Sequence, residues 1–243
     1  MSAPPMTRRT RQAALLLMLS GAATSVFASA EVAPVYEGYD ALWKTLPAPA
    51  FTLADERPLD APQSFEGHGF RAWGPVPRDG ERGRPGQHRI EVLGPDITID
   101  HHAFPFARAT VFPGEPPAEP GDDARLFVGP RDVCVQGTAP SASGTAQRHV
   151  HVAVVTDAFT KGAHRYDLPS LFGSCLAISR DGRGGLRFFA GSYHTAAGAQ
   201  VSDGVDFEPW RLRGGRFMKT GGAPLRIRCP DPDDVYRFSI ATP

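Results

Sequence analysis

Two histidines separated by one residue, His149 and His151, form the sharpest local motif in the chain. They lie in a run of alternating residues that is typical of a β-strand. Side chains two positions apart in a strand project from the same face, so both imidazoles could bind one metal ion. A complete site needs more ligands, and the nearest suitable ones are Asp157, His164 and His194. These five residues predict a divalent-metal site and, with it, a metal-dependent hydrolase.

An alternative interpretation places both histidines on the polar face of a half-exposed strand, because two histidines alone rarely make a metal site. No cofactor is predicted apart from this metal ion. The sequence contains no Gly-x-Ser-x-Gly nucleophile elbow, no Gly-Lys-Ser/Thr phosphate loop and no Cys-x-x-Cys pair. A binding function is therefore favoured over an enzymatic one.

Aromatic and arginine side chains beside glycines support this second hypothesis, because both residue types supply much of the binding energy at protein interfaces. The candidates are Trp73, Tyr193, Trp210, Arg211, Arg213, Arg216 and Phe217. They predict a protein partner of unknown identity, as for a periplasmic inhibitor or immunity-type protein. Simple alternation offers another interpretation of one segment, in which Trp210 and Leu212 face the core and the neighbouring arginines face solvent.

Three cysteines, Cys134, Cys175 and Cys229, follow the N-terminal region. In an oxidising compartment this number permits one disulfide and one remaining thiol. The sequence leaves all three pairings open.

The N-terminal thirty residues have the order of regions found in a secretory signal peptide. Arg8, Arg9 and Arg11 precede an apolar stretch over residues 13–27, and small residues then lead to Ala30. We expect export by the general secretory route, cleavage after Ala30, and a periplasmic or secreted product. Since no cysteine follows the apolar stretch directly, a soluble product is favoured over a lipid-anchored one.

Charge argues against nucleic acid as a partner, and hydropathy argues against membrane insertion. Residues 1–30 hold three of the 26 basic residues and none of the 26 acidic ones, so cleavage leaves 23 basic against 26 acidic residues, a formal charge of −3. Nucleic acid is therefore an unfavourable partner. No later segment is apolar enough for membrane insertion after signal cleavage.

The fold class follows from frequent turn residues, 26 Gly and 24 Pro, between short strand-like runs. We predict an all-β protein, mainly antiparallel, with a sandwich, barrel or propeller-like architecture. Three regions are expected: a signal peptide over residues 1–30, an irregular Pro/Gly-rich arm with one short helix over 31–87, and a β-rich domain over 88–243. In the arm, helical spacing begins at Tyr39, Asp40 is placed to cap the helix, and Pro47 stops it.

Within the β-rich domain, alternation predicts most strands directly. A hairpin is expected around Asp181-Gly182, since both residues tolerate positive φ. Tyr236, Phe238 and Ile240 are expected to share one face. The expected strands cover 90–92, 97–99, 109–112, 126–128, 133–135, 148–155, 175–179, 186–189, 205–212, 225–229 and 235–240.

Overall fold

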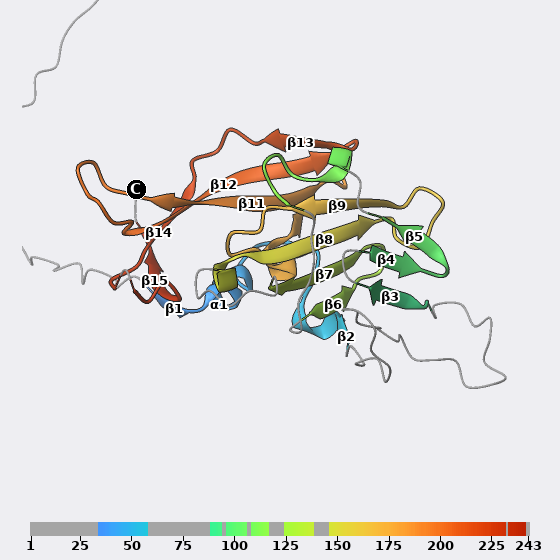
Figure 1. The fold of residues 1–243 in the computed structure, drawn as a ribbon. Helices are drawn as coiled ribbons and strands as arrows, with labels where there is room; N and C mark the ends of the chain where they lie inside the picture. The colour runs from blue at the N-terminus through green and yellow to red at the C-terminus, as the bar shows by residue number, and fades with distance from the viewer. Residues whose placement is uncertain are drawn as a thin grey trace, which may run out of the picture. The chain divides into compact units, whose positions relative to one another are not determined.

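The computed structural model describes residues 34–57, 88–93, 96–105, 108–116, 124–138, 146–231 and 233–241. The predicted signal peptide and residues 58–87 of the predicted arm lie outside this part. The all-β class is confirmed, because the strands form three antiparallel sheets and the helical segments are short (Figure 1). Within the described ranges, no helix combines the length and apolar character needed to cross a membrane.

The largest sheet has seven strands, in the order β1-β15-β14-β12-β11-β10 with β13 also paired to β12. Its strands are β1 Val35–Glu37, β10 Ser179–Arg180, β11 Leu186–His194, β12 Gly204–Arg213, β13 Arg216–Lys219, β14 Leu225–Arg228 and β15 Arg237–Ile240. The five-stranded sheet runs β2-β6-β7-β8-β9 and comprises β2 Glu56–Arg57, β6 Arg125–Val128, β7 Val133–Thr138, β8 Val150–Thr156 and β9 His164–Leu168. The three-stranded sheet comprises β3 Ile90–Leu93, β4 Asp96–Ile99 and β5 His102–Phe104.

The five-stranded sheet is the middle layer, because its two faces enter different hydrophobic cores. In β8, Val152 and Val154 belong to the larger core, which also contains residues of the seven-stranded sheet. Ala153 and Val155 belong to the smaller core, beside residues of the three-stranded sheet such as Ile97. The alternation predicted for this strand is correct, and both of its faces are covered rather than one.

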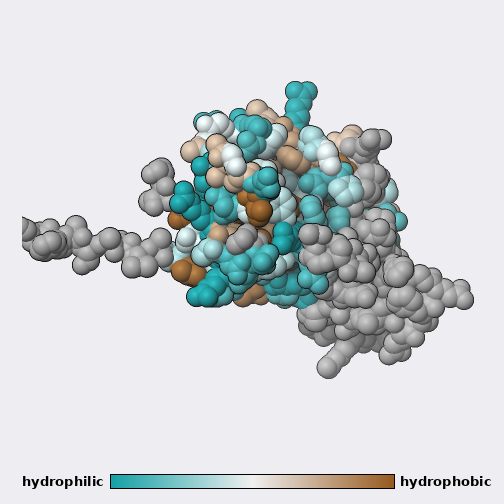
Figure 2. Space-filling model, turned by 60° about the vertical axis from the view of Figure 1, so that its left-hand side comes forward, coloured by the Kyte–Doolittle hydropathy of each residue, from teal (hydrophilic) through white to brown (hydrophobic). Residues whose placement is uncertain are grey.

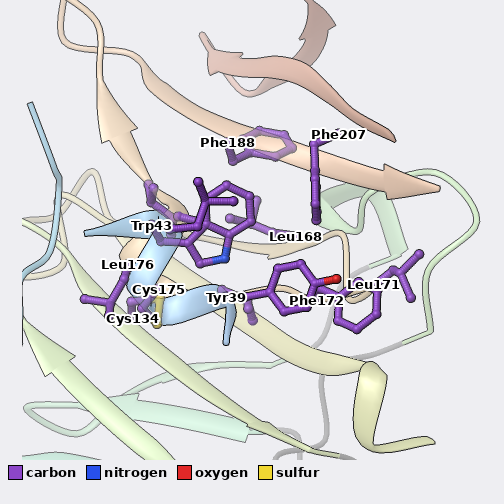
Figure 3. Packing of buried hydrophobic residues seen from close by; sticks show 14 of the residues in the cluster. Tyr39, Trp43, Cys134, Leu168, Leu171, Phe172, Cys175, Leu176, Phe188 and Phe207 are labelled. Carbon is purple, nitrogen blue, oxygen red and sulfur yellow. A yellow bond between two sulfur atoms is a disulfide. The ribbon is translucent and has the colours of Figure 1, made fainter. Parts of the chain in front are cut away.

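The larger core is built around the short helix α1, Tyr39–Trp43 (Figure 3). Trp43 stacks on Phe189 of β11 at 5.4 Å and meets Phe207 of β12 edge-on at 5.0 Å. Tyr39 stacks on Phe172 at 4.1 Å. Offset-stacked and edge-on pairs add favourable quadrupole interactions to the buried area, so these rings fix the helix against the seven-stranded sheet and against Phe172.

The helix differs from its prediction at both ends. It stops at Trp43, before the expected end at Pro47, and its N-cap is Gly38 at φ 82°, a conformation that favours glycine. The prediction of Asp40 as the cap is wrong. Its carboxylate instead accepts hydrogen bonds from Arg125 Nη1 at 2.9 Å and Ser174 Oγ at 3.0 Å.

Residues 34–57, expected in an irregular arm, form regular elements of the same compact unit, which extends over Ala33–Pro243. Strand β1 pairs with β15, and β2 pairs with β6. Between them lie α1 and the 3-10 helix Leu53–Asp55. The sequence hid these strands because they are two and three residues long, too short to show alternation.

Strand β12 pairs with two partners along its outer edge. Its first half, from Gly204, pairs with β14, and its second half, from Trp210, pairs with β13. Pro209 lies between the two halves and its carbonyl accepts a hydrogen bond from Thr220 N at 3.1 Å. In a strand the N–H and C=O of one residue point to the same side. The side on which Pro209 lacks an N–H is therefore the outer edge of β12, at the gap between β14 and β13, where neither strand pairs with it.

Two predicted strands are 3-10 helices instead. Residues 109–112 overlap the turn Arg108–Thr110, and residues 175–179 begin with the turn Cys175–Ala177. The second turn is capped by Ser174, whose Oγ accepts from Leu176 N at 3.2 Å. Local side-chain hydrogen bonds of this kind compete with strand pairing, and they depend on the fold around them.

A polar network links this turn to the middle sheet. Gln136 Oε1 of β7 accepts from Cys175 N at 2.6 Å and from Ser174 Oγ at 3.3 Å. Ser174 contacts Asp40, and Arg125 joins Asp40 to Glu56 through two further bonds of 2.8 and 2.9 Å. The hydrogen bonds from Arg125 lower the pKa of Glu56 against the opposing effect of burial. Buried polar groups need such partners, because an unpaired one costs the full desolvation free energy.

A disulfide joins Cys134 of β7 to Cys175 across 41 residues of sequence. Both residues are fully buried in the larger core, beside α1 (Figure 3). The prediction of one disulfide and one remaining thiol is confirmed, and Cys229 is the buried free cysteine. The bond holds the turn Cys175–Ala177 against the middle sheet.

We expect the double variant Cys134→Ala, Cys175→Ala to lower the free energy of unfolding by about 2–4 kcal/mol, since a loop of this length is no longer closed in the unfolded chain. Urea unfolding with and without reductant measures it. Reductant should destabilise the wild type and Cys229→Ala alike, and should leave the double variant unchanged. A wild type indifferent to reductant would contradict a stabilising disulfide.

Candidate functional site

The two histidines of the His-x-His motif have different surroundings. His149 is exposed just before β8, and its Nδ1 lies 3.0 Å from Ser170 Oγ. His151 is buried within β8, opposite Gly137 of β7, with 8% of its surface exposed. The expected polar, half-exposed face is therefore closed at His151, and Ala153 and Val155, which project from the same face further along β8, belong to the smaller core.

The other three predicted metal ligands lie apart from this pair. His164 pairs with Thr156 at the far end of β8, roughly 17 Å along the strand from His151. Asp157 is bound by Arg131 at 2.6 Å. His194 Nδ1 lies 3.1 Å from Asp206, whose pKa is lowered chiefly by its hydrogen bonds from Arg226. Among the described residues, no three His, Cys, Asp or Glu side chains gather as metal ligands.

Three of the predicted aromatic binding residues are placed, and Trp73 lies outside the described residues. Trp210 and Phe217 pack against the larger core, both meeting Phe112 edge-on at 4.9 and 5.5 Å. Leu212 is buried as well. The alternative interpretation, with Trp210 and Leu212 facing the core, thus describes this segment. Tyr193 differs, with 42% of its surface exposed.

The three predicted arginines surround the tight turn between β12 and β13. Arg213 and Arg216 are exposed and pair across Gly214-Gly215, whose φ angles of 56° and 74° fit a two-residue hairpin. Arg211 is half-buried two register positions inward, opposite Met218. They are not brought to Tyr193, which lies toward the opposite end of β11.

Tyr193 belongs to a surface cluster that we call the tyrosine patch: Arg148, Phe172, Tyr193 and Tyr236. Phe172 is buried beneath it, and its ring meets Tyr193 and Tyr236 edge-on at 6.3 and 6.1 Å. Tyr236 is also 42% exposed. Arg148 Nη1 donates a hydrogen bond to Tyr193 Oη at 3.3 Å. Four separate chain segments thus bring together two exposed phenol rings, one buried ring and a cation.

The loop that carries Phe172 is fixed by backbone hydrogen bonds. Phe172 N donates to Arg148 O at 2.7 Å, and Val150 N donates to Ser170 O at 2.9 Å. Gly173 permits this close approach, because a Cβ there would lie 2.7 Å from Val150 O. The patch therefore sits on a loop held directly against the start of β8.

Phe172 has a φ of 52°, in the left-handed region that bulky residues rarely adopt. Such a conformation costs of order 1–3 kcal/mol and persists only where the surrounding packing imposes it. Here Tyr39 stacks on the ring from below while Tyr193 and Tyr236 meet it from the sides. Strained residues of this kind cluster at ligand-contacting sites, which directs attention to this patch.

The pKa shifts at the patch keep Tyr236 neutral and Arg148 charged near neutral pH. Burial raises the pKa of Tyr236, with Arg148 acting in the opposite direction. The pKa of Arg148 is raised, mainly by its hydrogen bond with Tyr193. The patch therefore offers the neutral phenol of Tyr236, which donates and accepts hydrogen bonds, beside a permanent cation.

Exposed hydrophobic residues elsewhere are dispersed. On the face drawn in Figure 2 they appear as separate brown spots in a largely hydrophilic surface. The exposed large apolar side chains in the described ranges are Val35, Leu53, Tyr193, Val201, Met218 and Tyr236. Single exposed hydrophobes are normal on proteins, whereas Tyr193 and Tyr236 share contacts with one buried ring.

Sequence reasoning found Tyr193 and missed the other three members of the patch. Tyr236 was expected on one face with Phe238, but it precedes β15 and only Phe238 is fully buried in the core. Arg148 was assigned to a strand that begins at Val150. The sequence carries no signal for Phe172, because its position depends on long-range hydrogen bonds to residues 148–150.

Compared with known proteins, the chain matches no family model, no curated protein and no solved structure.

The left-handed backbone at Phe172 gives a direct test of the site's geometry. Both Phe172→Ala and Phe172→Gly should destabilise the protein by about 3–5 kcal/mol, since each removes a buried ring. The glycine variant should be the more stable of the two by about 1 kcal/mol, because glycine adopts positive φ without steric cost.

Phe188 provides the matched control, because it is equally buried but lies within β11. There the order should reverse, with Phe188→Gly less stable than Phe188→Ala by about 0.5–1 kcal/mol. Urea unfolding of the four variants gives both differences. The same order at the two positions would contradict the left-handed conformation of Phe172.

Proposed function

We propose that the protein is an exported, soluble binding protein that contacts a protein partner through the tyrosine patch. The observation that carries this proposal is the pair of exposed rings, Tyr193 and Tyr236, held against one buried and strained ring, with Arg148 at hydrogen-bond distance from Tyr193. Tyrosine and arginine are enriched among the residues that dominate protein interfaces.

Rigidity supports the same proposal. A tyrosine loses little conformational entropy on binding, since it has only two side-chain torsions. Phe172 further restricts both rings before any partner arrives, and the fixed loop beneath it limits backbone motion. Preorganised contacts raise affinity by lowering the entropic cost of association. Inhibitors that cap another exported protein use such rigid surfaces, which makes an inhibitor or immunity-type role the form of binding that we favour.

Export is the second part of the proposal. The order of charged, apolar and small residues over positions 1–30 supports it, and the disulfide is compatible with an oxidising compartment. N-terminal sequencing of the naturally processed protein should begin at Glu31, and non-reducing peptide mapping should recover Cys134 joined to Cys175. Processed protein that retains the first thirty residues would contradict cleavage.

We expect Tyr193→Ala and Tyr236→Ala each to weaken partner binding at least tenfold, since each removes a ring from the centre of the contact. Affinity capture from an extract of exported proteins, quantified by mass spectrometry, identifies partners retained by the wild type. Titration calorimetry then measures the dissociation constant of each purified partner.

Met218→Ala is the matched control, because Met218 is 40% exposed and lies on β13, outside the patch. A partner bound equally by wild type and Met218→Ala, but lost by both tyrosine variants, supports the proposal. A partner that binds both tyrosine variants as tightly as the wild type would overturn it. A glycan array provides the other decisive outcome, since saturable glycan binding lost in both tyrosine variants would assign the patch to carbohydrate instead of protein.

A further inference from the structure

A second candidate site lies at the opposite end of the same strands. A cleft of about 500 Å³ opens where three turns meet, those between β8 and β9, β10 and β11, and β12 and β13. We call it the three-turn cleft. Its lining combines Thr156, Asp157, His164, Tyr166, Arg183, Gly184, Gly185, Leu186, Leu212, Arg213, Gly214 and Gly215. The volume lies in the range of small-molecule sites.

Two arginine side chains that line this cleft have no ionic partner in the described part of the chain. Neither the Arg183 nor the Arg213 guanidinium makes a hydrogen bond or ion pair with the described part of the chain. The acidic lining residue, Asp157, is already bound by Arg131 at 2.6 Å. Asp181, just outside the cleft, directs Oδ1 to the backbone N–H groups of Arg183 and Gly185.

Arginine side chains also surround Asp181 with positive charge. Its pKa is lowered first by those two backbone hydrogen bonds and then by the positive charges of Arg187 and Arg213. Asp181 therefore partly offsets Arg187 and Arg213 through space, with its hydrogen bonds going to backbone N–H groups, and Arg131 offsets Asp157. The Arg183 and Arg213 guanidinium groups keep their N–H donors for an anion, and guanidinium is the group best shaped to bind phosphate or carboxylate oxygens.

A buried tyrosine provides an independent indication of a ligand. Tyr166 is only 7% exposed, yet its hydroxyl lines the cleft, 3.4 Å from where a Cβ at Gly215 would stand. This hydroxyl has no hydrogen-bond partner among the described residues. Burial raises the pKa of Tyr166, so the group is a neutral donor at physiological pH. A buried side chain that directs an unused donor into an arginine-lined cleft is suited to an anionic ligand.

The turns around the cleft are shaped before any ligand binds. Gly185 has no room for a side chain, because a Cβ would lie 2.9 Å from Asp181 Oδ2 and 3.1 Å from Leu212 O. The hairpin around Asp181 is confirmed, although positive φ occurs at Gly184, at 80°, and not at the predicted Asp181-Gly182. Asp157 N is held by the buried Asp132 at 2.9 Å.

We propose that the three-turn cleft binds a small organic molecule bearing a phosphate or sulfate group, with Arg183 and Arg213 on the oxyanion and Tyr166 donating a hydrogen bond to it. Leu186 and Leu212, both buried, form an apolar floor for the organic part. A volume of about 500 Å³ exceeds what one tetrahedral oxyanion fills, which is why the ligand carries an organic group.

The site is distinct from the tyrosine patch. Leu186 and Tyr193 are seven residues apart on β11, a separation of roughly 24 Å along the strand. Variants of one site therefore leave the other unchanged, and the two proposals fail independently.

Calorimetric titration with sodium pyrophosphate and, separately, sodium sulfate at low ionic strength tests the site with simple probes. We expect saturable binding of at least one anion, weakened at least tenfold in Arg183→Gln and in Arg213→Gln, because each removes a charge-assisted hydrogen bond. Tyr166→Phe should weaken binding about three- to tenfold. Pyrophosphate binding without sulfate binding would assign a phosphate ligand, and the reverse a sulfate ligand.

Arg216→Gln is the matched control, because it removes the same charge from the same hairpin but does not line the cleft. Its affinity should stay within about twofold of the wild type, and Tyr193→Ala should behave likewise. In ¹H–¹⁵N spectra the anion should shift the amide signals of Gly184, Gly185, Gly214 and Gly215. Absence of saturable binding, equal loss in Arg216→Gln, or shifts confined to other residues would overturn the proposal. Thermal unfolding of each variant confirms that the protein compared is folded.

Discussion

The burial of the five-stranded sheet on both faces is the constraint on which the rest of the structure depends. Strands β7 and β8 present apolar side chains to each side, Cys134 and Val154 to the larger core and Val135 and Val155 to the smaller one. A sheet with two apolar faces is stable only when both are covered. The seven-stranded sheet with α1 covers one face and the three-stranded sheet covers the other. Because the middles of these strands are committed to packing, the ends of the strands and their turns are where exposed functional groups can gather.

Because both faces of the five-stranded sheet are buried, a polar side chain within it needs a hydrogen-bond partner. Gln136 lies in β7 among apolar neighbours, and it is satisfied because its side-chain oxygen accepts from Cys175 N and Ser174 Oγ. The disulfide acts at the same place, so one turn is attached to the middle sheet by a covalent bond and a hydrogen-bonded side chain. Replacing the Gln136 side chain would leave the buried Cys175 N–H without this acceptor, and a buried polar group without a partner is costly. The network continues through Asp40 to Arg125, which connects the short helix to the edge of the sheet.

How far the sequence predicts this fold depends on the range of the interactions involved. The alternation of β8, the all-β class and the presence of one disulfide follow from local pattern and composition, and all three are confirmed. The cap at Asp40 was wrong because that carboxylate binds Arg125, 85 residues away. His151 is buried although a half-exposed strand was expected, because no local pattern indicates that a strand will be covered on its second face. Of the tyrosine patch only Tyr193 was predictable, since the patch is assembled from segments that approach one another only after folding.

Only two residues, Gly173 and Ser174, separate Phe172 of the tyrosine patch from Cys175 of the disulfide. The loop between them has its start fixed by hydrogen bonds to residues 148–150 and its end fixed by the bond to Cys134. A backbone held at both ends cannot relax the positive φ of Phe172 by shifting, so the strain is retained and the ring stays beneath Tyr193 and Tyr236. If the patch binds the protein partner that we propose, two rings already held in one arrangement lower the entropic cost of that association.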